Sequence, residues 1–485
     1  MPSQIADQSG RLFGGNLHVF SNFKNTGDID FVVCWFYRAA EYIQGTRIQV
    51  GLVATNSITQ GEQVPLVWGL LFDRFKIKIH FAHRTFEWES EARGKAHVHV
   101  VILGFGAFDT TNKRIYDYES EKVTVVTANN ISPYLTPGPD LFVTKRSRPI
   151  CDVPEMRCGN KPTDDGNLIL TDEEKIAFVK DEPAAKKFLR RFTGSEEFIN
   201  GNMRWCLWLK DASPGELRSM PKVMERVQRV KEFRLKSTAE PTQKAAMTPT
   251  LFFYISQPTT EYILIPEVSS ERRQYIPIGF VSKDIISANT NFLICSNSFY
   301  HFGVLTSSMQ MAWVRQVCGR LKSDYRYSGS MVYNNFPWPN PTPEQRERVE
   351  EKAKAVLVAR EPHLPPKGLA TLADLYDPLS MPPALAKAHA DLDRAVEKCY
   401  RSEPFDSDRH RVEFLFSLYE KLTAPLLPAT PKTKGRRSQT AATTPPSGKQ
   451  KTPGLYAQKI PPGKSTPESE AGAAHFWTAK EEPPK

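Results

Sequence analysis

Long apolar runs are missing from this chain of 485 residues, whose hydrophobic content is 40%. A helix that spans a membrane needs about 20 consecutive apolar residues, and the sequence contains no such stretch. The N-terminus also lacks the basic and apolar segments of a secretory signal. We therefore expect a cytoplasmic protein that does not contact a membrane.

Paired cysteines are missing as well. The seven cysteines are an odd number and show no C-x-x-C spacing, so the sequence indicates neither a disulfide framework nor a zinc ribbon. Cys151 and Cys158 lie close in sequence, but no second pair supports a metal site there. We expect no metal centre.

Basic residues outnumber acidic ones, and the formal net charge is +10. The segment 429–485 contains ten Lys/Arg against four Glu, so it carries +6 of that charge. The other +4 is compatible with a polyanionic partner such as DNA without requiring one. Because Pro, Thr, Ser, Gly and Lys dominate 425–485, we expect a disordered basic tail. A solvated linker is favoured there over a nonspecific nucleic-acid contact.

Periodicity and glycine stops divide the first 120 residues into the helices and strands of an α/β sheet. We expect helices at 30–43 and 64–72 and strands at 50–56, 77–82 and 97–104. In open α/β sheets, ligands bind outside the carboxyl ends of the strands. Thr55, Asn56 and the loop 83–95 should therefore face a site.

The pattern changes after residue 145. Short aromatic runs between 145 and 339, with a basic helix at 221–236 among them, predict a mostly β module with inserted helices. Helical spacing and charged faces then predict a small helical unit, with helices at 343–360, 384–401 and 408–422.

Two aromatic residues, Phe86 and Trp88, occupy the predicted loop between the second and third strands. An extruded base needs a flat apolar partner, because unstacking has a free-energy cost that aromatic contact offsets. Both residues suit that role at a strand end, although two aromatics in a loop are more often packing residues.

Four histidines, His80, His83, His97 and His99, lie close together in the sequence. No carboxylate sits at ligand spacing, so hydrogen-bonded or solvated histidines are favoured over a metal site. The nearby Gly104-Phe-Gly106 lacks the third glycine and the acidic residue of a dinucleotide loop, which favours a strand-ending turn.

Basic, acidic and aromatic residues are interleaved in the segment 319–328. Lysine donates to the major-groove acceptors of guanine and aspartate accepts from the amino group of cytosine, so Lys322 and Asp324 together could read one G·C pair. Tyr325, Arg326 and Tyr327 complete the candidate DNA-binding set. Charged residues around tyrosines are also typical of an ordinary surface, and that alternative stays open.

Four blocks of the sequence together resemble one protein family. They are 39–43 (AAEYI), 54–63 (ATNSITQGEQ), 80–86 (HFAHRTF) with 93–98 (RGKAHV), and 319–327 with 332–339 (VYNNFPWP). On these motifs the chain resembles the MmeI-like family of adenine-specific DNA methyltransferases, and the resemblance extends from the N-terminus to about residue 422.

The resemblance implies a multidomain α/β and α+β protein. Its parts would be the C-terminal half of a Rossmann-like class I methyltransferase sheet (1–120), a connector (121–145), a mostly β DNA target-recognition domain (146–340), a helical domain (341–424) and the tail (425–485). It also implies roles for single residues. Phe86 would stack on a flipped adenine, Trp35 would lie near the adenine of the cofactor S-adenosylmethionine, and the pair Lys322 and Asp324 would help to choose a base.

Two motifs of that family do not appear in the sequence: the glycine-rich cofactor loop and the catalytic N-P-P-[FY] tetrapeptide, whose asparagine and first backbone carbonyl accept hydrogen bonds from the adenine amine. Asn130-Ile-Ser-Pro-Tyr134 looks superficially like the tetrapeptide, but it lacks the second proline and is similar to the family's connector. We therefore expect that no S-adenosylmethionine binds this chain alone. The expected partners are double-stranded DNA and a separately encoded N-terminal methyltransferase half.

Two classes of function stay open. The chain is either part of an adenine-specific methyltransferase, from a split or truncated gene and inactive without its N-terminal half, or a DNA-specificity module without a catalytic role. A decayed gene remnant belongs with the second class. The first is favoured, because half a sheet with an unpaired edge is an aggregation hazard that a dedicated binding protein would have little reason to keep.

Overall fold

The computed structural model describes residues 29–88, 98–118 and 122–424. All of them belong to one compact unit. The tail predicted at 425–485 lies outside the described residues, as do His97 and part of the loop predicted at 83–95. None of the helices in the described part has the length and apolarity that a bilayer crossing requires.

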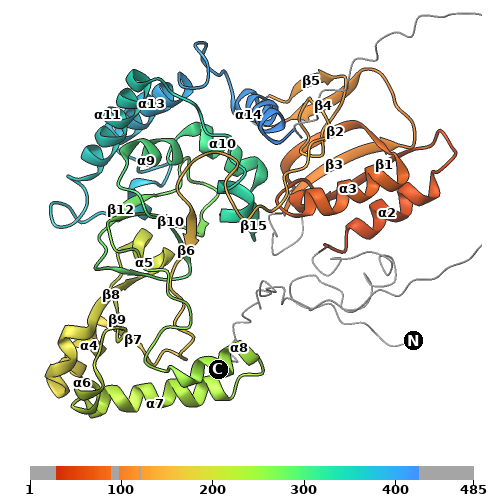
Figure 1. Cartoon of the computed structure of the whole chain (residues 1–485). Coiled ribbons are helices and arrows are strands. Elements are labelled where there is room, and N and C mark those ends of the chain that lie inside the picture. Colours follow the sequence, from red (N-terminus) through yellow and green to blue (C-terminus); the bar gives the residue numbers. More distant parts are fainter. Residues whose placement is uncertain (1–28, 89–97, 119–121, 425–485) are drawn as a thin grey trace, which may run out of the picture. The chain divides into compact units, whose positions relative to one another are not determined.

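Five strands near the start of the chain form one mixed sheet in the order β1-β3-β2-β4-β5 (Figure 1). Their bounds are β1 (Gln49–Thr55), β2 (Lys78–Trp88), β3 (Val98–Gly106), β4 (Lys113–Asp117) and β5 (Thr124–Ala128). Strand β3 is antiparallel to both β1 and β2, so β1 and β2 run parallel to each other. Because β4 is parallel to β2, the carboxyl ends of β1, β2 and β4 meet at one end of the sheet.

Two helices, α2 (Val33–Tyr42) and α3 (Gln63–Phe75), pack on the sheet through their apolar faces. The buried ring of Phe36 in α2 stacks on Phe105 of β3, with ring centroids 5.8 Å apart. Trp68 of α3 meets Phe36 edge-on at 6.1 Å, and its Nε1–H donates to the carbonyl of Ile58 at 2.8 Å. The α3 contact therefore also anchors the loop that follows β1.

The sequence pattern predicts both helices and three of the five strands. Residues 83–88, predicted as loop, instead form the end of β2, and β5 carries the sheet past residue 120, where the pattern ends the domain. Register shifts between Ile79 and Phe81 and between His83 and Phe86 break the strict alternation that a strand pattern requires. β4 and β5 have five residues each, too few for a clear periodic signal.

The region after the sheet contains three small sheets, in the strand orders β12-β10-β14-β6, β11-β16-β15 and β13-β8-β9-β7. The strands are β6 (Met156–Cys158), β7 (Ile169–Thr171), β8 (Leu189–Thr193), β9 (Arg204–Leu207), β10 (Tyr262–Pro266), β11 (Val268–Ser269), β12 (Gly279–Val281), β13 (Ile286–Ser287), β14 (Asn291–Ile294), β15 (Gly319–Leu321) and β16 (Asp324–Arg326). The inserted helices are α4 (Asp172–Asp181), α5 (Ser195–Asn200), α6 (Pro214–Arg218), α7 (Pro221–Leu235), α8 (Glu240–Lys244), α9 (Phe299–Leu305) and α10 (Ser308–Val317).

The last described segment is helical, as the sequence pattern predicts. Its helices are α11 (Pro343–Arg360), α12 (Leu372–Leu375), α13 (Pro383–Glu397) and α14 (Asp408–Thr423). Helix α11 begins with a capping box, in which Thr342 and Gln345 satisfy each other's backbone N–H groups, and with Pro343 in the first turn.

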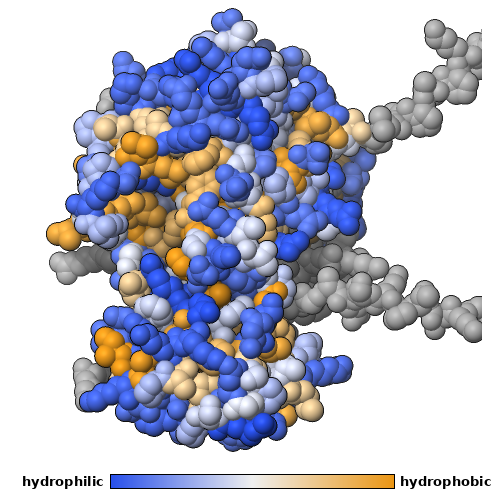
Figure 2. All heavy atoms as spheres, turned by 60° about the vertical axis from the view of Figure 1, so that its left-hand side comes forward, coloured by the Kyte–Doolittle hydropathy of each residue, from blue (hydrophilic) through white to orange (hydrophobic). Residues whose placement is uncertain are grey.

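Hydrophilic side chains cover most of the face in Figure 2, with orange apolar areas between them.

Helix α10 lies at the centre of the largest apolar core, and almost every one of its side chains is buried. Trp313 is fully buried, and its Nε1–H donates to the carbonyl of Val332 at 3.1 Å. Its ring lies 5.6 Å from the ring of Phe416 and 5.8 Å from that of Tyr419, both in α14. One helix therefore joins the region of small sheets at 156–326 to the C-terminal helices.

A buried arginine organises the second apolar core, which lies around β7, β8, β9 and α7. Arg234 near the end of α7 is fully buried, and its guanidinium donates to five backbone carbonyls at 2.8–3.2 Å, those of Pro162, Thr163, Ala245, Thr248 and Leu251. A buried carbonyl without a hydrogen-bond donor has a large desolvation cost. The Arg234 guanidinium satisfies these carbonyls and thereby fixes two loops to the end of α7.

Replacing Arg234 with Met keeps the apolar stem and removes all five donors. We expect the free energy of unfolding to fall by about 3 to 5 kcal/mol, because several buried carbonyls lose their partner at once. Urea denaturation followed by tryptophan fluorescence measures the change. Arg229→Met is the matched control on the exposed face of the same helix, where the arginine pairs with Glu225, and it should change stability by less than about 0.5 kcal/mol. Equal losses in both variants would contradict the role given to Arg234.

Candidate functional site

The carboxyl ends of β1 and β2 carry residues that the sequence pattern assigns to a site. Thr55 ends β1, and a short 3-10 turn at Asn56–Thr59 follows, with the hydroxyl groups of Thr55 and Ser57 2.9 Å apart. Phe86 lies near the end of β2, which runs parallel to β1. The structure therefore brings Thr55, Asn56 and Phe86 to the same end of the sheet, the position where open α/β sheets bind ligands.

Phe86 is half-buried within a row of aromatic side chains. Its ring centroid lies 5.0 Å from that of Tyr118 and 6.3 Å from that of Trp88, which is 49% exposed. Two positions earlier, Arg84 on β2 forms a 2.7 Å ion pair with Asp117 of β4, and both side chains are largely buried. This pair ties the two strands together beside Phe86. Its members are 33 positions apart, so no local sequence signal marks them.

Trp35 projects from α2 and is 63% exposed. It borders an open hollow of about 580 Å³ whose other lining residues are Arg38, Ala39, Glu41, Tyr42 and Leu52. Leu52 belongs to β1, which pairs with β3 alone among the described strands. Trp35 therefore stands on an apolar surface beside an unpaired strand edge, separate from Phe86.

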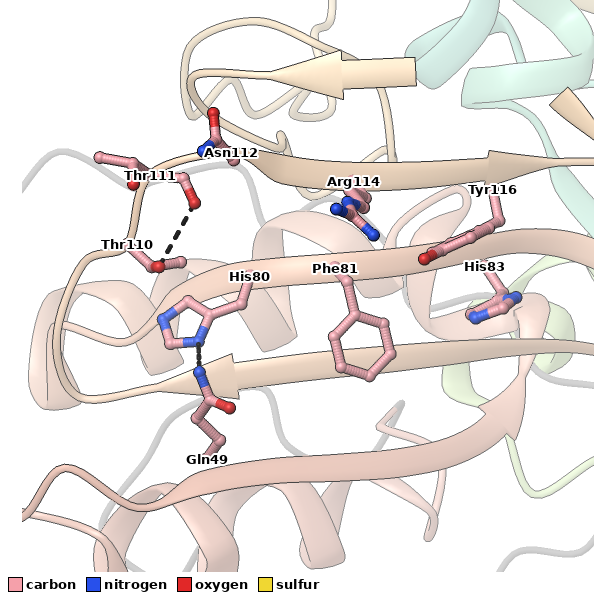
Figure 3. A pocket seen from close by; sticks show the side chains of 9 residues that line it. All are labelled: Gln49, His80, Phe81, His83, Thr110, Thr111, Asn112, Arg114 and Tyr116. Atoms are coloured by element: carbon pink, nitrogen blue, oxygen red, sulfur yellow. Dashed lines mark hydrogen bonds between the residues drawn. The ribbon is translucent and has the colours of Figure 1, made fainter. Parts of the chain in front are cut away.

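A second hollow, of about 360 Å³, opens over the start of β1 and β2 and the loop before β4 (Figure 3). His80 lies there with one ring nitrogen 3.2 Å from Gln49 Nε2 and the other 2.8 Å from the carbonyl of Phe108. His83 is 2.6 Å from the Tyr118 hydroxyl and stacks on Tyr116 at 4.3 Å, and burial lowers its pKa.

These contacts confirm the prediction of hydrogen-bonded side chains for His80 and His83. In the part of the chain that the structure describes, no group of three or more His, Cys, Asp or Glu side chains is placed to hold a metal ion.

Strands β15 and β16 form a hairpin whose two-residue turn is Lys322-Ser323. Lys322 is exposed at the tip with φ at +57°, a left-handed conformation that lysine rarely adopts. Asp324 lies across the turn, and its Oδ1 accepts a hydrogen bond from the backbone N–H of Glu271 at 3.3 Å. Arg326 is exposed and pairs with Glu267 at 3.0 Å. The structure thus brings Lys322, Asp324 and Arg326 together on the outer side of one hairpin.

Tyr325 and Tyr327, predicted as DNA-binding residues, are buried, and this corrects the prediction. Tyr325 lies under the Arg320 guanidinium at 4.1 Å, and the Tyr327 hydroxyl accepts a hydrogen bond from Gln310 Nε2 at 2.9 Å. Successive side chains of a strand point to opposite faces. Asp324 and Arg326 alternate with the two tyrosines along the strand. The sequence alone therefore indicates that the charged residues and the tyrosines lie on opposite faces.

A cavity of about 160 Å³ lies between the carboxyl end of the sheet and the root of the hairpin. The sheet side and the recognition side both contribute polar groups to it, among them Thr59, Gln60, Arg84, Asp117, Arg315, Gln316 and Arg320. The Gln60 Oε1 atom and the Arg320 Nε atom are buried and have no hydrogen-bond partner among the described residues. The carboxyl end of the sheet and the root of the hairpin therefore face each other across a small space that polar groups line in part.

The segment Asn130-Ile-Ser-Pro-Tyr134 forms a turn that its own side chains close. Asn130 Nδ2 donates to the Gly138 carbonyl at 2.9 Å and to Asp140 Oδ1 at 2.8 Å, while its Oδ1 accepts from Lys113 Nζ at 3.3 Å. Tyr134 is buried, and its hydroxyl accepts from the Val143 N–H at 3.1 Å. These contacts leave neither side chain available to a base, which fits the predicted role as a connector.

Three family models match the chain in succession. The model of the MmeI DNA-methyltransferase domain matches residues 14–117, that of the MmeI target recognition domain residues 137–340, and that of the MmeI C-terminal domain residues 341–427.

Two relatives extend this result. DNA methyltransferase A of Bacillus subtilis (strain 168) is 42% identical over 408 residues, which cover 84% of this chain and 45% of that protein. The structure of the type IIL restriction-modification enzyme MmeI in complex with DNA matches with a TM-score of 0.75 at 51% identity, over 84% of this chain and 54% of that one. The chain thus spans about half the length of the relatives it matches.

The three matched segments follow one another over most of the described residues, and they contain the sheet with Phe86, the hairpin with Lys322 and Asp324, and the terminal helices. The chain therefore belongs to the MmeI family of DNA methyltransferases, with methyltransferase, target-recognition and C-terminal domain sequence.

Proposed function

We propose that this chain recognises a specific duplex DNA sequence and helps to hold a flipped adenine while a methyl group passes from S-adenosylmethionine to its exocyclic amine. The observation that carries the proposal is the joint placement of two features in one compact unit: an exposed charged hairpin tip and an aromatic ring at the carboxyl end of a methyltransferase-type sheet. Because the relatives are about twice as long, we propose that methyl transfer also needs a cofactor-binding half.

Base reading is assigned to the β15–β16 hairpin. A two-stranded ribbon fits the major groove of B-DNA, where lysine can donate to guanine and aspartate can accept from cytosine. Two-residue turns favour Gly, Asn or Asp at positions with positive φ, yet Lys322 occupies such a position. A strained residue at an exposed tip supports a functional role for its charge.

Exchanging the two charges, by Lys322→Asp with Asp324→Lys, should change the preferred base pair at one position of the recognised site. Each lost base contact is worth about 1 to 3 kcal/mol. Selection from a library of random duplexes, performed with the full chain, yields the preferred site before and after the exchange.

The control exchanges Lys387 and Asp391, an exposed pair 2.7 Å apart in α13, and should leave the site unchanged. An unaltered site in the first variant would refute the assignment of the hairpin.

Holding of the flipped base is assigned to Phe86. Its half-exposed ring is fixed from behind by Tyr118, and the buried Arg84–Asp117 ion pair keeps β2 in place beside it. Stacking on an aromatic ring offsets part of the cost of extruding a base. In this role the chain positions the base and provides an apolar surface for it, and it transfers no proton. The rate of methyl transfer depends mostly on the orientation of the reacting groups.

Phe86→Ala should weaken binding of the selected duplex by about 1 to 3 kcal/mol, the usual contribution of one stacked base. A mismatch at the target adenine lowers the free-energy cost of flipping that base. The wild-type chain can stack the flipped base and the variant cannot, so the mismatch should strengthen binding by the wild-type chain more than binding by the variant. Fluorescence anisotropy measures both affinities. Phe253→Ala removes a 37% exposed phenylalanine of the recognition region and serves as control. Equal gains from the mismatch in wild type and Phe86→Ala would exclude the stacking role.

The residues present fit one end of S-adenosylmethionine. The exposed Trp35 ring, with Leu52 and Tyr42 beside it, offers an apolar wall suited to the cofactor's adenine. When bound, the cofactor supplies the methyl group as a sulfonium. We propose that Trp35 supports the adenine and that the cofactor-binding half, joined at the edge of β1 that no described strand covers, holds the rest of the molecule.

Calorimetry on the isolated chain should therefore show no S-adenosylmethionine binding at micromolar concentrations, because a single aromatic wall contributes only about 1 to 3 kcal/mol. With the cofactor-binding half present, binding should appear, and Trp35→Ala should weaken it more than Tyr254→Ala, which removes another exposed aromatic. Micromolar affinity of the isolated chain would show instead that it holds a complete cofactor site.

A further inference from the structure

The loop after β1 touches the root of the base-reading hairpin at a pair of glycines. A Cβ atom added to Gly61 would lie 3.0 Å from the Cα atom and 3.2 Å from the backbone N of Gly319. Gly61 also has φ at +54°, in the left-handed region that other residues rarely adopt. Two independent features therefore disfavour a side chain at position 61: the left-handed backbone conformation and the close contact with the Gly319 backbone.

Both partners in this contact are firmly held. On the sheet side, Gly61 follows the turn that Trp68 anchors through the Ile58 carbonyl. On the hairpin side, Gly319 directly follows α10 and the buried Cys318, whose Sγ–H donates to the Arg326 carbonyl at 2.8 Å and closes the root of the hairpin. Gln316 Nε2 donates to the Tyr134 carbonyl at 2.7 Å, which fixes the end of α10 to the connector.

The contact stands between the two functional positions proposed above. Gly61 lies a few residues beyond the carboxyl end of β1, the end of the sheet where Phe86 sits, and Lys322 lies three residues beyond Gly319 at the hairpin tip. A strand advances about 3.3 Å per residue, so the tip is about 10 Å from the contact. Any displacement at the hairpin root is therefore transmitted to the base-reading residues.

We propose that Gly61 is a positioning residue: its backbone contact with Gly319 sets the distance along the duplex between the base pair read by the hairpin and the base held at Phe86. This inference rests on the proposed function. A side chain at position 61 would push the hairpin away from the sheet and misalign the two parts of the site, whereas the DNA-contacting side chains themselves would be unchanged.

The structure provides matched variants. Gly61→Ala and Gly61→Asn both add the Cβ atom, and asparagine tolerates the left-handed conformation better than alanine, so Gly61→Asn isolates the contact from the backbone strain. Gly45→Asn and Gly45→Ala place the same side chains at φ +72° with nothing within 4 Å.

The experiment uses the full chain and the duplex it selects from a random library. Affinity is measured for that duplex and for duplexes with one base pair inserted or removed next to the base pair read by the hairpin. The wild-type chain should prefer the intact spacing by about tenfold or more, since a shifted contact is lost like a mismatch. The Gly61 variants should bind the intact site about 3- to 10-fold more weakly and should distinguish the spacings by less than about threefold.

The variants at Gly45 should keep the wild-type preference, and they report the loss of thermal stability that the backbone conformation alone causes. Hydrogen exchange of the backbone amides at 319–326 should be faster only in the Gly61 variants. A Gly61→Asn protein with the wild-type spacing preference would overturn the inference and leave the proposed function intact. A wild-type chain that selects no sequence would refute the proposed function itself, and the inference with it.

Discussion

The burial of helix α10 on all sides is the constraint on which the arrangement of the functional residues depends. A helix without an exposed face cannot shift without opening apolar surface to water, at a cost of about 25 cal/mol per Å². Trp313 locks α10 against α14 and the Val332 carbonyl, and Gln316 locks it against the connector. The hairpin that begins two residues after α10 ends therefore starts from a fixed point.

The fixed position of α10 explains why the residues assigned to function lie at the periphery of the fold, whereas the side chains that hold them in place are buried. Lys322 is exposed in a strained turn, and Phe86 is a half-buried ring at a strand end. Behind them, Cys318, Tyr325 and Tyr327 are buried, and the Arg84–Asp117 pair is largely so. A buried support with satisfied hydrogen bonds holds a functional group in place better than a surface contact does, and an exposed ion pair such as Glu62–Lys145 at 2.6 Å contributes little.

Local patterns were enough to predict the helices and strands with strong periodicity, among them α2, α3, α11 and β3. They were not enough where the chain departs from strict alternation. The irregularity between His83 and Phe86 made the end of β2 look like a loop, and the short strands β4 and β5 gave no signal. Tyr325 and Tyr327 were predicted as DNA contacts because their composition was weighed without the two-residue period of the strand. The contact of Gly61 with Gly319 joins residues that are 258 positions apart in the sequence. Nothing in the sequence around either glycine indicates this contact.

The edge of the sheet at β1 bears on how the chain acts. β1 has seven residues without a charge or a proline, and the apolar side chain of Val53 on it is 49% exposed. Proteins normally blunt such edges with charges, proline, short strands or a cover. The opposite edge, β5, has only five residues. The longer edge at β1 lies beside the hollow at Trp35. An element that paired with β1 would cover an edge that no described strand covers, and it would complete the apolar wall at the same time. Phe86 lies on β2, two strands away in the order β1-β3-β2, which is about 10 Å at the usual strand spacing. A cofactor held beside β1 and a base held at β2 would therefore occupy neighbouring positions along one sheet. The β15–β16 hairpin, to which we assign base reading, has its root next to the loop that follows β1.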